Sequence, residues 1–219
     1  MQTIDLTINA ATLLRLLWLS VAGFALAMLV TPLYTKAAYH WQWWKKQRTD
    51  TLGGEVAAVY NKLHAAKHRR HVPNMAGIIF VVAIAVVTIA FNLQRSQTWL
   101  PLAGLLGAGF IGLIDDIMNI RGSSRIAGMG AKIKFLSYSL VTLALGWWFY
   151  DKLDVTSIYL PWLHQLPLGV GVVALFWFVV VATANSVNIS DGLDGLAGGL
   201  LMTSFLAYAI IAVVQGQYG

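Results

Sequence analysis

The sequence contains no cysteine, which excludes disulfide bridges and cysteine-ligated metal sites. Charged residues are scarce as well: they make up 11% of the chain, against about 25% in an ordinary soluble domain. The opening residues, MQTIDLTINA, place no lysine or arginine ahead of the first apolar run, so this run does not resemble a cleaved signal peptide. The chain is instead 58% hydrophobic, with a mean hydropathy of +0.68, which indicates an integral membrane protein of the helical type.

Six apolar segments approach the length of about 20 residues that a helical membrane span requires. They lie near residues 12–34, 76–93, 100–118, 135–150, 168–187 and 195–215. The second and fourth are the shortest and can extend into flanking residues. The sequence therefore predicts an all-α, polytopic transmembrane bundle of about six spans, which forms a single transmembrane domain over residues 1–219.

The basic residues are unevenly distributed between the predicted spans. Twelve of the 15 lysines and arginines lie in the loops 35–75 and 119–134. Positively charged loops face the cytoplasm, so these two loops and the turn 188–194 are predicted to be cytoplasmic, with the N-terminus outside. The basic charge then serves topology and contact with anionic headgroups or a phosphorylated substrate, and we expect no nucleic-acid partner.

Two clusters of polar residues fall at this predicted cytoplasmic face. The first is the adjacent pair Asp115 and Asp116 in GFIGLIDDIMN; the second is Asn188, Asp191 and Asp194 in NSVNISDGLDGLAGG. Carboxylates beside hydrocarbon are candidate functional groups, although a pair at a helix end can also simply lie in water. Magnesium suits such a face, because it prefers oxygen ligands and often bridges carboxylates to substrate phosphates.

Other residues near these clusters allow two interpretations. Lys132 and Lys134 either contact a diphosphate or extend toward the interface as snorkelling side chains. The glycine-rich segment after Asn188 either approaches a ligand closely or forms a simple turn in which Asp191 caps the next helix. If this segment were helical throughout, the three polar residues of the second cluster would share one face.

Three blocks of the sequence resemble the polyprenyl-phosphate sugar-1-phosphate transferases (glycosyltransferase family 4). RRHVPNMAGI is similar to the family's entry to its second span, GFIGLIDDIMN to its Asp-Asp block, and NSVNISDGLDGLAGG to its most specific block. Within the third block, the motif Asp-Gly-Leu-Asp-Gly-Leu-Ala favours the branch that uses UDP-N-acetylmuramoyl-pentapeptide over the undecaprenyl-phosphate N-acetylglucosamine-1-phosphate branch.

The resemblance implies a fold of about ten spans in the bacterial inner membrane, with a magnesium-dependent cytoplasmic active site. There, undecaprenyl phosphate attacks the sugar-linked phosphorus of the nucleotide donor and UMP leaves. By resemblance, Asp115 and Asp116 are catalytic and Asn188 binds the metal. The expected substrate-binding residues are Arg69, Lys134, Asn185, Asp191 and Asp194. The family also allows a homodimer.

The sequence departs from the family pattern in two places. The second span opens with NMAG where the family has two glycines after methionine, and the family's later spans, Gly-Asp block and histidine-rich loop do not follow within the 219 residues. The resemblance thus implies a chain that is incomplete at its C-terminus. Two alternatives stay open: an aromatic prenyltransferase, whose Asp-rich motifs fit these residues poorly, and a degenerate, non-catalytic membrane paralogue.

Overall fold

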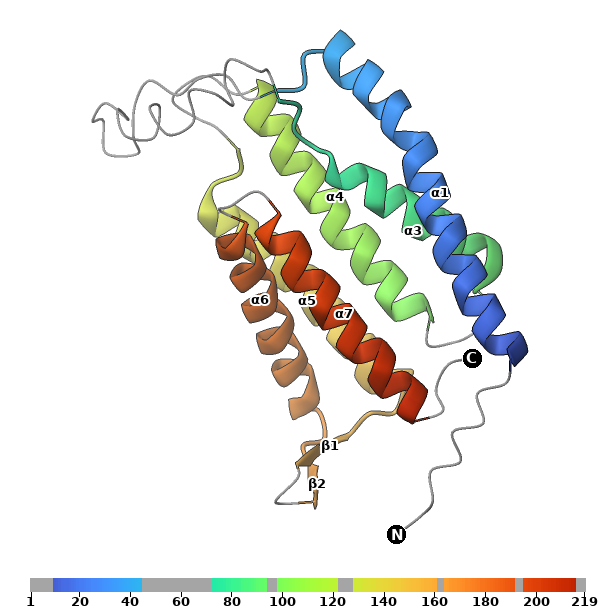
Figure 1. The fold of residues 1–219 in the computed structure, drawn as a ribbon. Coiled ribbons are helices and arrows are strands. Elements are labelled where there is room, and N and C mark those ends of the chain that lie inside the picture. Colours follow the sequence, from blue (N-terminus) through green and yellow to red (C-terminus); the bar gives the residue numbers. More distant parts are fainter. Residues whose placement is uncertain are drawn as a thin grey trace.

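The computed structural model describes residues 10–44, 72–93, 98–121, 128–160, 164–191 and 195–215. Within these ranges it contains six helices and two short strands (Figure 1). The helices are α1 (Ala10–His40), α3 (Gly77–Phe91), α4 (Trp99–Arg121), α5 (Ala131–Asp151), α6 (Gly171–Ser190) and α7 (Leu196–Val214). They lie at the six predicted positions, which confirms the prediction of a helical membrane bundle.

Four of these helices, α1, α4, α6 and α7, are long and apolar enough to cross a bilayer. Helices suit such segments because every internal backbone N–H and C=O is bonded within the helix itself. Helix α3 has only 15 residues, about 22 Å at 1.5 Å per residue. Helix α5 has 21 residues, but it carries Lys132, Lys134 and Asp151 near its ends.

The helices pack in chain order, with α3 between α1 and α4 and with α5 between α4 and α6 (Figure 1). Helix α7 packs against α6, and none of its residues, all of which are described, is buried. Because the helices alternate in direction, α1, α4 and α6 finish at the end of the bundle where α3, α5 and α7 begin. We call this the aspartate end, since Asp115, Asp116 and Asp191 lie there.

Two helix boundaries differ from the predicted spans by four residues or more. Helix α1 continues to His40 rather than ending near residue 34, because Tyr34 and Ala38, one turn apart, pack against Ile79 of α3. Helix α5 begins at Ala131 rather than near residue 135, which brings Lys132 and Lys134 into its first turn. In both cases polar residues extend a helix beyond the apolar run that hydropathy detects.

A β-hairpin that the sequence did not predict lies between α5 and α6. Strands β1 (Ser157–Leu160) and β2 (His164–Pro167) pair antiparallel, with Tyr159 opposite Gln165. The hairpin lies at the opposite end of the bundle from the aspartate end (Figure 1). Each strand has only four residues, too few for an alternating pattern to stand out.

Small residues allow the helices to approach closely, as is common in membrane bundles. A Cβ atom at Gly107 of α4 would lie 3.0 Å from Val141 of α5, and one at Gly109 would lie 3.2 Å from Val81 of α3. At Gly146 of α5, a Cβ would lie 3.3 Å from both side-chain and backbone atoms of α6. These glycines set the spacing of α4 from its two neighbours and of α5 from α6.

Replacing Gly146 by valine should therefore destabilise the bundle by about 1–3 kcal/mol, the usual effect of overpacking. The matched control is Gly23→Val in α1, where a Cβ would meet nothing within 4 Å. Both changes introduce the same β-branched side chain into a helix, so helix propensity cancels between them. Thermal unfolding in detergent measures the difference, and equal losses in the two variants would contradict close α5–α6 packing.

Candidate functional site

The two adjacent aspartates lie near the end of α4 and face different neighbours. Consecutive residues of a helix project about 100° apart. Asp115 points toward the start of α5, where it contacts Met129 and Lys134. Asp116 instead lines a cavity of about 340 Å³ between α3 and α4. The pair is therefore divided between two sides of α4.

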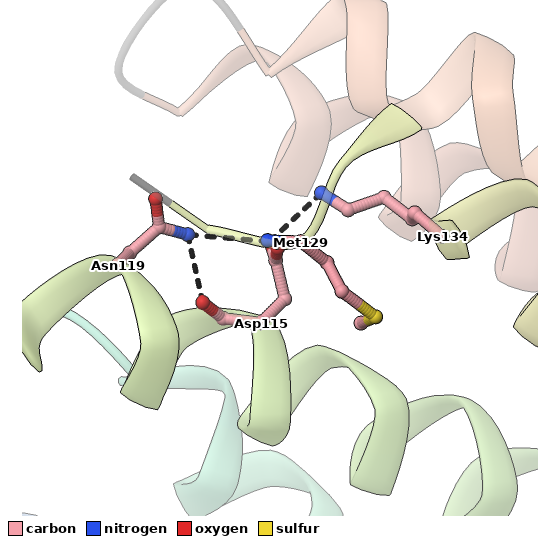
Figure 2. A network of polar contacts seen from close by, with 4 residues as sticks. All are labelled: Asp115, Asn119, Met129 and Lys134. Carbon is pink, nitrogen blue, oxygen red and sulfur yellow. Dashed lines mark hydrogen bonds and ion pairs between the residues drawn. The ribbon is translucent and has the colours of Figure 1, made fainter. Parts of the chain in front are cut away.

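Asp115 is the centre of a polar cluster that joins α4 to the start of α5 (Figure 2). Its Oδ1 accepts a hydrogen bond of 2.8 Å from the backbone N–H of Met129. Its Oδ2 accepts one of 2.8 Å from Lys134 Nζ and a longer one of 3.3 Å from Asn119 Nδ2. Asn119 Nδ2 also donates to the Asp115 backbone carbonyl at 2.9 Å.

The ion pair of Asp115 and Lys134 is partly shielded from solvent. The Asp115 side chain is 15% exposed and that of Lys134 is 37% exposed. A charge-assisted hydrogen bond in such a place is stronger than one between neutral groups. One interpretation of the sequence was that Lys134 only snorkels toward the interface. In the structure its ammonium group instead forms an ion pair with Asp115. A lysine ammonium has three donors, and this contact uses one, so the same group can also contact a phosphate.

Gly128 and Asn119 are residues of this cluster that the sequence analysis did not single out. Gly128 is buried and has a φ of +81°, a conformation that glycine adopts readily. A Cβ at this position would lie 2.7 Å from Asn119 Oδ1. Gly128 thus allows the chain to pass close to α4, which places the Met129 N–H at Asp115. The spacing of Asp115 and Asn119, four residues apart on one helix, was the available signal.

The segment before α3 is held against α1 at the same end of the bundle. The Tyr34 hydroxyl donates to the Asn74 carbonyl, and the Asn74 N–H donates to the Trp43 carbonyl at 2.7 Å. Met75 follows with a φ of +69°, an unusual value for a residue with a side chain. These contacts anchor the described part of the first sequence block. Arg69, predicted to bind substrate, lies outside the described residues.

The second predicted cluster lies where α6 ends and α7 begins. Asn185 and Asn188 are exposed residues of α6, and Asp191, also exposed, directly follows the last residue of this helix. Because α6 ends at Ser190, the segment is not one continuous helix, so the condition under which the three polar residues would share a helix face is not met. The residue that precedes α7 is Gly195, with a φ of +85°, so the interpretation that Asp191 caps the next helix is wrong. Asp194 lies outside the described residues.

The metal prediction rests on this same end of the bundle. Asp116 and Asp191 supply carboxylate oxygens and Asn188 an amide oxygen, which is the donor chemistry that magnesium prefers. Among the residues that the structure describes, no three histidine, cysteine, aspartate or glutamate side chains are grouped closely enough to hold an ion. The role of Asn188 as a metal ligand and the magnesium itself stay predictions.

The fold and this site define a polytopic helical membrane protein with a carboxylate–lysine cluster at one end of the bundle. The sequence profile of Glycosyl transferase family 4 matches residues 98–219. This match covers more than half of the chain, and the chain belongs to this family. The resemblance stated from the three sequence blocks is confirmed.

Individual relatives carry the name phospho-N-acetylmuramoyl-pentapeptide-transferase. The protein of Desulfosudis oleivorans is 30% identical over 93% of this chain and 54% of its own length. That of Syntrophus aciditrophicus is 36% identical over 80% of this chain and 49% of its own. That of Clostridium botulinum is 28% identical over 99% of this chain and 62% of its own. The chain thus spans about half the length of the curated relatives that it matches.

Proposed function

We propose that the protein transfers phospho-N-acetylmuramoyl-pentapeptide from its UDP-linked form to undecaprenyl phosphate and releases UMP. The names of relatives at 30–36% identity over 80–93% of the chain support this reaction. The structural observation that carries it is the ion pair of Asp115 and Lys134, which lies at the end of the bundle where the third sequence block also falls.

In this proposal the lipid phosphate oxygen attacks the sugar-linked phosphorus, and the bond from that phosphorus to UMP breaks. Phosphoryl transfer depends on positioning and on stabilisation of negative charge. Lys134 supplies positive charge to the diphosphate through the donors that Asp115 does not use. Asp115 holds the Lys134 ammonium and the Met129 segment in place, so we assign it a positioning role.

The other polar residues complete the proposed site. Asn188, Asp191, Asp194 and Asp116 would supply oxygen ligands for magnesium, and the bound ion would neutralise charge on the diphosphate. Asn185, exposed on α6, and Arg69 are proposed to contact the donor substrate. The site then faces the cytoplasm of a bacterial cell from the inner membrane, with the N-terminus outside, as the distribution of basic loops predicts.

The protein, expressed from its complete gene and placed in nanodiscs, tests this proposal directly. We expect UMP release that requires both UDP-N-acetylmuramoyl-pentapeptide and undecaprenyl phosphate, and that EDTA abolishes and added magnesium restores. Release of UMP from UDP-N-acetylglucosamine would instead identify the N-acetylglucosamine-1-phosphate branch. Nucleotide release that does not need the lipid phosphate would exclude a transferase of this kind.

A further inference from the structure

We propose that a hollow between the start of α1 and the end of α3 binds the phosphate of an anionic phospholipid, in the leaflet opposite the aspartate end. The hollow has a volume of about 290 Å³ and is lined by Arg15, Trp18 and Leu19 of α1 and by Phe91 of α3. It lies at the end of the bundle where α1 begins (Figure 1). The site is separate from the transfer reaction proposed above and does not depend on it.

The position of Arg15 along α1 places its guanidinium at the depth of lipid phosphates. Residues 16–35, which separate Arg15 from Lys36, carry no charge. This helical segment rises about 30 Å, which matches the thickness of the hydrocarbon core. When Lys36 reaches the headgroups at the aspartate end, Arg15 therefore reaches those of the other leaflet. Trp18, almost one turn deeper, then lies where aromatic side chains gather at membrane surfaces.

Contacts with α3 hold this guanidinium in place. Its Nη2 donates a hydrogen bond of 3.1 Å to the carbonyl of Phe91, the last residue of α3. Carbonyls in the last turn of a helix lack partners within the helix, and they favour a nearby cation. The rings of Trp18 and Phe91 also meet, with centroids 6.1 Å apart. The positive charge is therefore held between the two helices, at one wall of the hollow.

The guanidinium retains donors for a second, anionic partner. Arginine has five N–H donors in a planar fork that matches the oxygens of a phosphate, and the contact with Phe91 uses one of them. The ion pairs among the described residues join Lys134 to Asp115 and Lys152 to Asp151, so neither involves Arg15. A positive charge at this depth attracts an anion that the membrane itself supplies.

The walls of the hollow favour a phospholipid over a soluble anion. Trp18 is 62% exposed and Phe91 is 53% exposed, so both rings present apolar surface beside the guanidinium. A phospholipid can place its phosphate at Arg15 and an acyl chain along these rings, whereas inorganic phosphate has no apolar part. Phosphatidylglycerol has a net negative charge that offsets the charge of Arg15. Phosphatidylcholine carries its own cation, so we expect it to bind more weakly.

Photochemical labelling tests the site without requiring turnover. The complete protein is placed in phosphatidylcholine nanodiscs with a trace of phosphatidylglycerol that carries a diazirine on its acyl chain, close to the glycerol. We expect labelled peptides from residues 13–19 and 88–91. Helix α7, none of whose residues is buried, reports general contact with lipid and serves as the reference within the same protein.

Competition between lipids shows whether the labelled site is selective. Added unlabelled phosphatidylglycerol should lower the labelling of the hollow relative to that of α7, whereas the same amount of phosphatidylcholine should leave this ratio unchanged. Equal effects of the two lipids would overturn the proposal. A ratio that inorganic phosphate lowers as strongly as phosphatidylglycerol does would overturn the assignment to a lipid.

Removal of the charge provides an independent test. Arg15→Gln keeps an N–H group that can donate to the Phe91 carbonyl but loses the positive charge. One basic side chain strengthens attraction to anionic lipid about fivefold, so we expect labelling relative to α7 to fall about fivefold. Lys152→Gln is the matched control, because it removes the same charge at the same end of the bundle and Lys152 does not line the hollow. An equal loss in both variants, or no loss in Arg15→Gln, would overturn the proposal.

Two features of these experiments keep the inference apart from the fold and from the proposed function. The competition between lipids uses wild-type protein, so it can overturn the site even if thermal unfolding shows that Arg15→Gln disrupts the bundle. Wild-type UMP release without selective labelling would remove the lipid site and leave the transferase standing. Selective labelling without UMP release would leave the lipid site standing and remove the proposed reaction.

Discussion

Replacing Asp115 by asparagine is expected to lower the turnover of UMP release about 100-fold while the fold remains intact. Asparagine retains an oxygen that can accept from the Met129 N–H, but it removes the negative charge that holds Lys134 Nζ at 2.8 Å. Removing one preorganised hydrogen-bond donor that is aimed at charge developing in a transition state typically reduces turnover by about 100- to 1,000-fold. The partly exposed ion pair itself should contribute only about 1 kcal/mol to stability.

The lysine partner gives a second test of the same ion pair. Lys134→Met should produce a similar loss of turnover, and the double variant should lose little more, because residues that act as a unit are not additive. A positioning role for Asp115 predicts a large fall in kcat, with little change in the melting temperature or in either KM. A loss of activity that instead followed thermal stability across the variants would show that the pair serves only the fold.

The chain contains a matched control for the Asp115→Asn substitution. Asp151 pairs with Lys152 at 3.0 Å at the other end of α5, and both side chains are more exposed than those of the first pair. Asp151→Asn removes the same charge from the same kind of contact but far from the aspartate end. We expect wild-type turnover in this variant. Wild-type turnover in Asp115→Asn as well would contradict the assignment of the site.

Replacing Gly128 by alanine is the second change for which we expect a large effect. A residue with a side chain costs about 1–2 kcal/mol in the left-handed conformation, and the φ of Gly128 is +81°. The added Cβ would in addition lie 2.7 Å from Asn119 Oδ1, so Asn119 or the chain must move. Movement of the chain withdraws the Met129 N–H from Asp115, and we expect turnover to fall about tenfold.

Two other glycines separate the causes of this effect. Gly169 has a φ of +53° and open space around its Cβ position, so Gly169→Ala tests the backbone strain alone. Gly130 has a φ of −56° and open space, so Gly130→Ala should leave thermal stability unchanged. We expect the loss of stability to increase in the order Gly130, Gly169, Gly128. A loss at Gly128 no greater than that at Gly169 would mean that the contact with Asn119 is not restrictive.

The structure changes how the aspartate pair is understood. The resemblance to the family gave both residues the same predicted role, as catalytic groups. Asp115 faces Lys134 of α5, whereas Asp116 lines the cavity between α3 and α4. Although the two residues are adjacent in sequence, their side chains project from different sides of α4. Each can therefore be tested independently.

Some local features could be predicted only to within a turn of helix. Hydropathy placed the apolar part of α1 and α5 correctly, but both helices continue into polar residues. Contact between Ala38 and Ile79 supports the end of α1, and such a contact between distant residues leaves no local signal. The glycine-rich loop before α5 was visible in the sequence, whereas the need for glycine at position 128 depends on Asn119, nine residues earlier on α4.

The sequence by itself determined the helical membrane character, the six helix positions and the end of the bundle at which the motifs lie. These follow from local composition, because an apolar segment in lipid must bond its own backbone groups, and a helix does so without help from other segments. Only the tertiary structure decided that Lys134 and the Met129 N–H donate hydrogen bonds to Asp115, and that Asp116 lines the cavity between α3 and α4. Those outcomes depend on how each helix is rotated against its neighbours, which small residues at the contacts set and hydropathy does not record.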